Sequence, residues 1–253
     1  MTPQQYLENV LEKYNLTEGQ VANLKAERQY VEDVLKTYFG STIETVYYSG
    51  SYAKGTTISL RFDLDVCLYF RRDSFASLEA MYYMTLEALQ EDGLDANPQT
   101  VSIHVNFGGN DIDVVPARSL GDGTGNANLY VTSQKRSLQT NIPKHKEYVS
   151  KHQARPIIKL MKVWRHRHGI HFKSFALELL VIKALGDAAS GDFGAQLWKA
   201  LEFARDHAPE ARLVDPANAN NIVSDLIPFE DKQNLSRQAG ASMGKKTWGE
   251  ILW

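Results

Sequence analysis

Two short segments of the chain combine residue types that can handle phosphate groups and divalent cations. The first is residues 50–57, Gly-Ser-Tyr-Ala-Lys-Gly-Thr-Thr. Its glycines can adopt backbone angles that other residues avoid, so we expect a tight turn from Gly50 onward whose N–H groups hold a phosphate. The second contains Asp63 and Asp65, which the two-residue period of a strand puts on one face. Such close carboxylates repel each other unless a strong positive charge, most simply a divalent cation, lies between them.

The segments around these residues predict a small mixed sheet flanked by helices. Runs of β-branched and aromatic residues or alternating polarity indicate strands, and apolar residues at helical spacing indicate a helix. The expected strands cover 43–48, 63–70, 101–107 and 111–117, and the expected helix covers 74–90.

The last of these strands carries a further pair of carboxylates. If the sheet is contiguous, one of Asp111 and Asp113 can share a face with Asp63 and Asp65 and complete a triad. We favour Asp113, because Asp111 lies next to the preceding glycine turn, where an aspartate often only caps the turn.

The second half of the chain is expected to be helical. In 155–168 an apolar stripe lies opposite a face with Lys162, and the surrounding segment is rich in Lys and Arg. Such a face can attract a polyphosphate. The start of the next expected helix, at Ser174, could offer N–H groups and a hydroxyl to an anion.

These patterns divide the chain into four expected parts within one α/β (α+β) architecture. A nucleotide-handling lobe with a small mixed sheet is joined to a C-terminal helical lobe, with the active site in the cleft between them. The parts are N-terminal bracing helices at 1–40, a catalytic core at 41–118, a connecting loop at 119–143 and a helical domain at 144–253.

Composition describes an ordinary globular protein rather than a dedicated nucleic-acid binder. The 253 residues are 43% hydrophobic and 23% charged, with a formal net charge of −2, so there is no general basic excess. The single cysteine, Cys67, fits a reducing compartment, and neither a signal sequence nor a membrane-spanning run is present. We therefore expect a cytoplasmic protein that needs no membrane.

Taken together, the motifs resemble the DNA polymerase β-type nucleotidyltransferases, in which Gly-Ser precedes Asp-x-Asp on one strand and a third Asp on a later strand. The chain looks most like the branch of 2′-5′ oligoadenylate and cyclic GMP-AMP synthases, which includes the bacterial CD-NTases. The likeness is carried by these segments, in this order: 50–57, 63–66, 113–117, 160–164, 174–180 and 215–221.

The resemblance implies a set of site residues and cofactors. Two Mg²⁺ ions, with Mn²⁺ as a substitute, would be held by Asp63, Asp65 and Asp113, which are also the implied catalytic residues. The implied nucleotide-binding residues are Gly50, Ser51, Lys162, Ser174 and Phe175. Phe175 stands where relatives often carry a Tyr that stacks on a base, so a stacking face remains without the hydroxyl.

Simpler interpretations of the same residues stay open. Asp63 and Asp65 could be solvated strand residues paired with Arg61, Arg71 or Arg72. The basic helix face could be an exposed, solvated surface or a patch for an RNA backbone. Phe175 could be a core residue.

The resemblance implies a template-independent enzyme that makes a short cyclic or linear oligonucleotide signal from nucleoside triphosphates, as in bacterial antiphage defence. It needs no stable nucleic acid partner, and a downstream effector protein would bind the product. Two alternatives remain: a nucleotidyltransferase that modifies a macromolecule such as tRNA or a protein, or a silent nucleotide sensor. A synthase that makes linear oligo(deoxy)nucleotides without cyclising them is a further variant.

Overall fold

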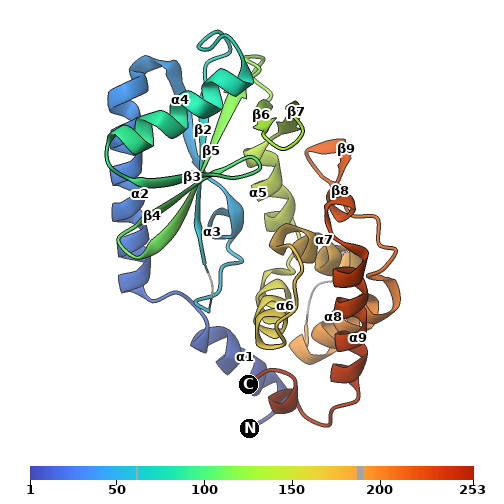
Figure 1. The fold of residues 1–253 in the computed structure, drawn as a ribbon. Coiled ribbons are helices and arrows are strands. Elements are labelled where there is room, and N and C mark those ends of the chain that lie inside the picture. Colours follow the sequence, from blue (N-terminus) through green and yellow to red (C-terminus); the bar gives the residue numbers. More distant parts are fainter. Residues whose placement is uncertain (61, 187–190) are drawn as a thin grey trace. The chain divides into compact units, whose positions relative to one another are not determined.

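The computed structural model describes residues 1–60, 62–186 and 191–253, and it divides the chain into two compact units (Figure 1). The sheet unit comprises Thr17–Ala53 and Phe62–Lys146. The helical unit comprises Met1–Leu16, Lys54–Arg61 and Glu147–Trp253. Neither unit is a continuous stretch of sequence: a short segment interrupts the sheet unit, and the helical unit joins segments that lie far apart in the chain.

The sheet unit is built on a mixed sheet that has seven strands within the described residues. Five strands lie in the order β1-β2-β5-β4-β3, and β6 and β7 extend the sheet from one end of β5. Strand β2 is parallel to β5, whereas the other pairs are antiparallel. The bounds are β1 Ile43–Tyr48, β2 Leu64–Phe70, β3 Asp95–Pro98, β4 Ile103–Phe107, β5 Asn110–Ser119, β6 Ala127–Val131 and β7 Arg136–Thr140.

Helices α2 (Glu18–Phe39) and α4 (Leu78–Glu91) cover one face of this sheet (Figure 1). Helix α2 begins at a capping box, in which Thr17 and Gln20 satisfy each other's backbone N–H groups. Helix α4 supplies the crossover that a parallel β2–β5 pair requires. The central strand β2 is buried, with Leu64, Val66 and Leu68 fully inaccessible.

The helical unit has its own hydrophobic core, centred on α6 and α7. Trp164 of α6 is fully buried, and its indole N–H donates to Ser242 at 2.9 Å. Helix α1 joins the same core through Leu7 and Val10. The bounds are α1 Pro3–Lys13, α6 Arg155–Arg167, α7 Ser174–Leu185, α8 Phe193–His207 and α9 Phe229–Met243, with a small hairpin of β8 Val214–Asp215 and β9 Asn218–Ile222.

Two helices have bounds that straddle the units: the short α3 (Gly50–Lys54) and α5 (Ile142–Lys151). Single turns of 3-10 helix, η1 Gly40–Thr42, η3 Val223–Leu226 and η4 Trp248–Glu250, complete the described elements. Within the described residues, no helix combines the length and apolarity that crossing a membrane requires.

The prediction of a mixed α/β lobe with a C-terminal helical lobe is confirmed, but one expected loop was wrong. Residues 119–143 were predicted as a connecting loop, yet they contain β6 and β7. Turn-forming residues before the apolar β6 and the polar residues of β7 obscure these strands in the sequence, and pairing of β6 with both β5 and β7 stabilises them. The short β3 and the β8–β9 hairpin were missed for the same reason.

Candidate active site

The parallel pairing of β2 and β5 places Asp65 directly opposite Asp113. Asp63 immediately precedes β2, and its charge acts on Asp113. Burial raises the pKa of the Asp113 carboxyl above its ordinary value, Asp63 raises it further, and His104 partly offsets this. Part of this rise comes from like charge, which a cation bound by these carboxylates would compensate.

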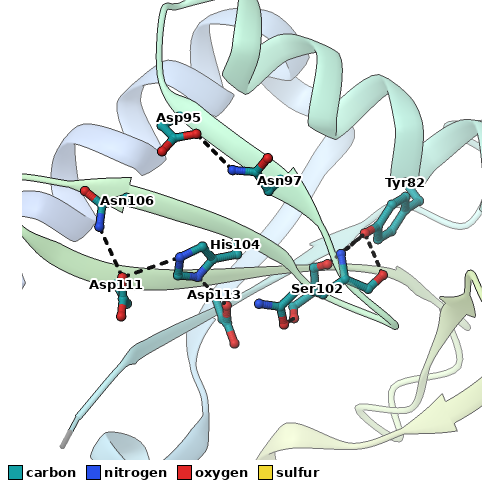
Figure 2. A network of polar contacts seen from close by, with 9 residues as sticks. Tyr82, Asp95, Asn97, Ser102, His104, Asn106, Asp111 and Asp113 are labelled. Carbon is teal, nitrogen blue, oxygen red and sulfur yellow. Dashed lines mark hydrogen bonds and ion pairs between the residues drawn. The ribbon is translucent and has the colours of Figure 1, made fainter.

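His104 lies on β4, opposite Asp113 in the sheet register, with its ring between Asp111 and Asp113 (Figure 2). Nδ1 is 3.5 Å from an oxygen of Asp113, and Nε2 is 3.4 Å from an oxygen of Asp111. Asn106 also donates to Asp111, at 3.2 Å. Asp113 and Asp111 are thus held through one imidazole ring, and the less exposed Asp113 is the one that faces Asp63 and Asp65.

Gly50 lies against Asp65 at the start of α3. Its φ is +58°, and an added Cβ would stand 1.5 Å from Oδ2 of Asp65. The preceding residue, Ser49, donates its N–H to the Asp65 carbonyl at 2.8 Å. Only glycine therefore permits this approach of the turn to the carboxylate, and the predicted glycine turn takes the form of a short helix, with the half-buried Ser51 in its first turn.

The carboxylates fit hard cations by their chemistry, although the described residues contain no group of three His, Cys, Asp or Glu side chains already close enough to hold a metal ion. All three side chains offer only oxygen atoms, which Mg²⁺ and Mn²⁺ prefer. Asp113 is half-buried and adjacent to the charge of Asp63, and a bound cation would offset both effects on its carboxylate.

The arginines proposed as simpler partners of Asp63 and Asp65 lie elsewhere or outside the described residues. Arg71 and Arg72 follow the far end of β2, where Arg71 donates to the Ser41 carbonyl at 2.7 Å and Arg72 interacts with Asp122. Arg61 lies outside the described residues.

The remaining predicted nucleotide contacts belong to the helical unit. Lys162 does not lie on an exposed basic face, because only 3% of its surface is accessible. Its Nζ donates to Glu178 at 2.6 Å and to Thr56 at 2.9 Å. Periodicity alone could not show this burial, because both partners come from other segments of the chain. Its contact with a triphosphate stays a prediction.

Ser174 and Phe175 form the first turn of α7. Ser174 is exposed and accepts a hydrogen bond from Arg165 at 3.1 Å, whereas Lys173 occupies the N-cap position. Phe175 is half-buried against the helical core, and Nζ of Lys54 lies 4.6 Å from its ring centroid. Its ring is thus partly a core side chain, and base stacking on it stays a prediction.

Sequence reasoning missed four residues: His104, Lys54, Thr56 and Glu178. For Glu178 a signal was present, since it is the one charged residue among the apolar residues 175–182. A carboxylate there needs a buried cationic partner. Lys54 and Thr56 were missed because the prediction of a phosphate-binding turn in their segment depended on the glycines and the serine.

Comparison with known families tests the resemblance. Residues 1–153 match the model of the Second Messenger Oligonucleotide or Dinucleotide Synthetase domain. The chain belongs to this family. It is accordingly a nucleotidyltransferase of the CD-NTase class, and the predicted resemblance is confirmed.

The similarity to individual members of the second-messenger synthetase family covers most or nearly all of the chain. A cyclic AMP-AMP-AMP synthase of Escherichia coli (strain MS 115-1) is 25% identical over 252 residues, which cover 88% of this chain and 78% of that enzyme. The E. coli MS115-1 CdnC:HORMA-deltaN complex contains a chain with a TM-score of 0.77 and 20% identity, covering 99% of this chain and 96% of that one.

A third relative has lower sequence identity and the same fold. The CD-NTase CdnG of Bradyrhizobium diazoefficiens, solved in complex with GTP, has a TM-score of 0.79 and 14% identity, covering 93% of this chain and 88% of that chain. At such identities the solved structures establish the fold of this synthetase-family chain.

Proposed function

We propose that this protein is a template-independent nucleotidyltransferase that joins nucleoside triphosphates into a short cyclic or linear oligonucleotide signal, with a role in bacterial antiphage defence. The observation that carries the proposal is the placement of Asp65 opposite Asp113, with Asp63 beside them, in a chain of the second-messenger synthetase family. The name of its E. coli relative makes ATP the first substrate to test.

In the proposed reaction a hydroxyl oxygen of one nucleotide attacks the α-phosphorus of another. A new P–O bond forms, the bond from the α-phosphorus to its bridging oxygen breaks, and pyrophosphate leaves. We assign Asp113 to accept the hydroxyl proton, because burial and Asp63 already raise the pKa of this carboxyl. Ser51 and the Gly50 turn, with Lys162 and Ser174 of the helical unit, are assigned to the phosphates, and Phe175 to a base.

Asp63, Asp65 and Asp113 would hold the divalent cations. Mg²⁺ bound there would neutralise charge on the phosphates and lower the pKa of the acceptor hydroxyl. The protein residues supply the fixed carboxylates, and the approach of Gly50 to Asp65 keeps the phosphate turn beside them.

The test is to incubate the purified protein with each NTP and Mg²⁺ and to analyse the products by mass spectrometry before and after phosphatase. A phosphatase-resistant oligonucleotide would identify a cyclic product, and a ladder with a 5′-triphosphate a linear one. The Asp63→Asn/Asp65→Asn variant should make neither, and product formation by this variant would contradict the assignment. No product from the wild type with any nucleotide would shift support to a macromolecular acceptor.

A further inference from the structure

A buried cluster of charged groups in the helical unit has Glu178 at its centre. Glu178 of α7 is fully inaccessible, and both of its carboxylate oxygens are engaged. Oε1 accepts from the Thr56 hydroxyl at 2.6 Å and from Nζ of Lys162 at 2.6 Å. Oε2 pairs with Nζ of Lys54 at 2.5 Å. Three side chains from two other segments thus meet at the carboxylate of Glu178.

The lysine partners of Glu178 favour the ionised form of its carboxylate. Burial by itself would raise the pKa of Glu178, but the ammonium groups of Lys162 and Lys54 outweigh it and lower the pKa to about 2. Burial lowers the pKa of Lys162 to about 8, with Glu178 opposing this change. In the buried cluster, two lysines thus pair with a single carboxylate, so the cationic groups outnumber the anionic one.

The cluster fixes the parts of the helical unit that the proposed function assigns to phosphate binding. Lys54 and Thr56 belong to the segment that begins at Gly50. Lys162 is an assigned phosphate contact, and Glu178 lies one turn after Ser174 in α7. Lys54 also stands over the ring of Phe175. Without Glu178 the two ammonium groups would repel each other and lose their fixed positions.

We propose that Glu178 is a positioning residue for triphosphate recognition: it holds Lys54 and Lys162 side by side, so that their combined positive charge acts on the phosphates of the bound nucleotide. The inference rests on the proposed function, since it takes a nucleoside triphosphate as the ligand. If Glu178 served packing alone, its replacement would affect folding, but it would change the affinities for a triphosphate and for a monophosphate to the same extent.

The experiment compares two ligands that differ in their phosphates. Binding of the non-hydrolysable analogue α,β-methylene-ATP is measured by calorimetry, and binding of AMP by NMR titration, both with Mg²⁺. In Glu178→Gln we expect the affinity for the analogue to fall at least tenfold and the affinity for AMP to stay within about twofold of the wild type. Equal losses for both ligands, or no loss for either, would overturn the proposal.

A second variant keeps the test decisive if Glu178→Gln does not fold. Thr56→Val removes the hydroxyl that Glu178 and Lys162 share, with almost no change in side-chain size. It should also weaken binding of the analogue more than binding of AMP, and wild-type affinities for both ligands in the folded variant would contradict the proposal.

The matched control is Glu32→Gln in α2, which removes another buried carboxylate that pairs with two cations, Arg28 and Lys36. It should leave the ratio of the two affinities unchanged, and a selective loss of analogue binding in this control would count against a specific role for Glu178. Failure of the proposed function has a different signature, because the wild type would then make no product from NTPs whatever the two affinities are.

Discussion

Asp65 on β2 and Asp113 on β5 occupy paired positions in a parallel register. In the sequence, a helix and two further strands separate β2 from β5. Asp113 is therefore grouped with Asp63 and Asp65, and burial, followed by the charge of Asp63, raises the pKa of its carboxyl. An acid whose pKa is raised on folding costs stability once it is ionised, so stability is lost as the pH rises through that pKa.

Replacing Asp113 should consequently lower activity and raise thermal stability. We expect Asp113→Asn to lower the rate of product formation by at least about 100-fold, since several kcal/mol of charge stabilisation depend on the metal ligands. The same variant should melt at a higher temperature than the wild type at pH 7.5 in EDTA, because the cost of burying the ionised carboxylate and its repulsion with Asp63 are both removed. Product assays and scanning fluorimetry measure the two effects, and a lower melting temperature would argue against carboxylate repulsion.

Gly50 is the position where a single methyl group should disable the site. In Gly50→Ala the Cβ would overlap Oδ2 of Asp65, and the left-handed φ alone costs about 1–2 kcal/mol. We expect a loss of product formation of at least about 100-fold and a lower free energy of unfolding. Gly19→Ala is the control, because Gly19 lies in the first turn of α2 with no atom within 4 Å of the added Cβ, so it should be neutral or slightly stabilising.

His104 should influence metal affinity without being a ligand itself. Its ring contacts both Asp113 and Asp111, so His104→Ala should let the Asp113 side chain reorient. Loss of such an outer partner typically costs about 10–100-fold in metal affinity. Titration with Mn²⁺ followed by electron paramagnetic resonance measures this directly. Asn106→Ala, which removes only a contact to Asp111, should bind Mn²⁺ like the wild type; equal losses in both variants would mean that the effect does not pass through Asp113.

Glu178 should give the protein a measurable acid sensitivity. Its pKa in the folded chain is lowered to about 2, whereas the pKa of a glutamate in an unfolded chain is about 4.3. A depressed acid pKa stabilises the fold above the unfolded value, and this stabilisation is lost as the pH falls from about 4.3 towards 2. Glu178→Gln should cost about 3–5 kcal/mol at pH 7, and the difference from the wild type should shrink as the pH is lowered. Urea unfolding between pH 7 and pH 3 tests this, and a difference independent of pH would refute it.

Much of the sheet could be predicted because its strands carry local signals. The alternation in β4 and the glycine turn after it predicted the hairpin that leads to Asp113, and the choice of Asp113 over Asp111 agrees with the observed register. Strand β6 carries apolar residues, but the turn-forming residues before it obscured their signal, whereas the mostly polar β7 forms a strand by pairing with β6.

The burial of Lys162 could not be predicted from its own helix. Spacing within α6 separates Lys162 from the apolar stripe, but the groups that bury and neutralise it come from Glu178 of α7 and Thr56. Contacts between segments distant in sequence leave no periodic pattern. The expected proximity of Asp65 and Asp113 is observed, because both lie on strands whose pairing follows from turns and hydrophobic alternation; their catalytic role stays a prediction.

The discontinuous helical unit has a consequence for the order in which the chain can fold during synthesis. Leu7 and Val10 of α1 are buried by side chains that follow residue 146, and the hydroxyl of Tyr14 donates to the carbonyl of Trp253 at 3.1 Å. The sheet unit, by contrast, needs no residue after 146. At ~5–20 residues per second, α1 leaves the ribosome on the order of 10 s before its partners exist. Helix α1 is therefore among the last elements to be buried, and until then its apolar stripe is exposed to solvent.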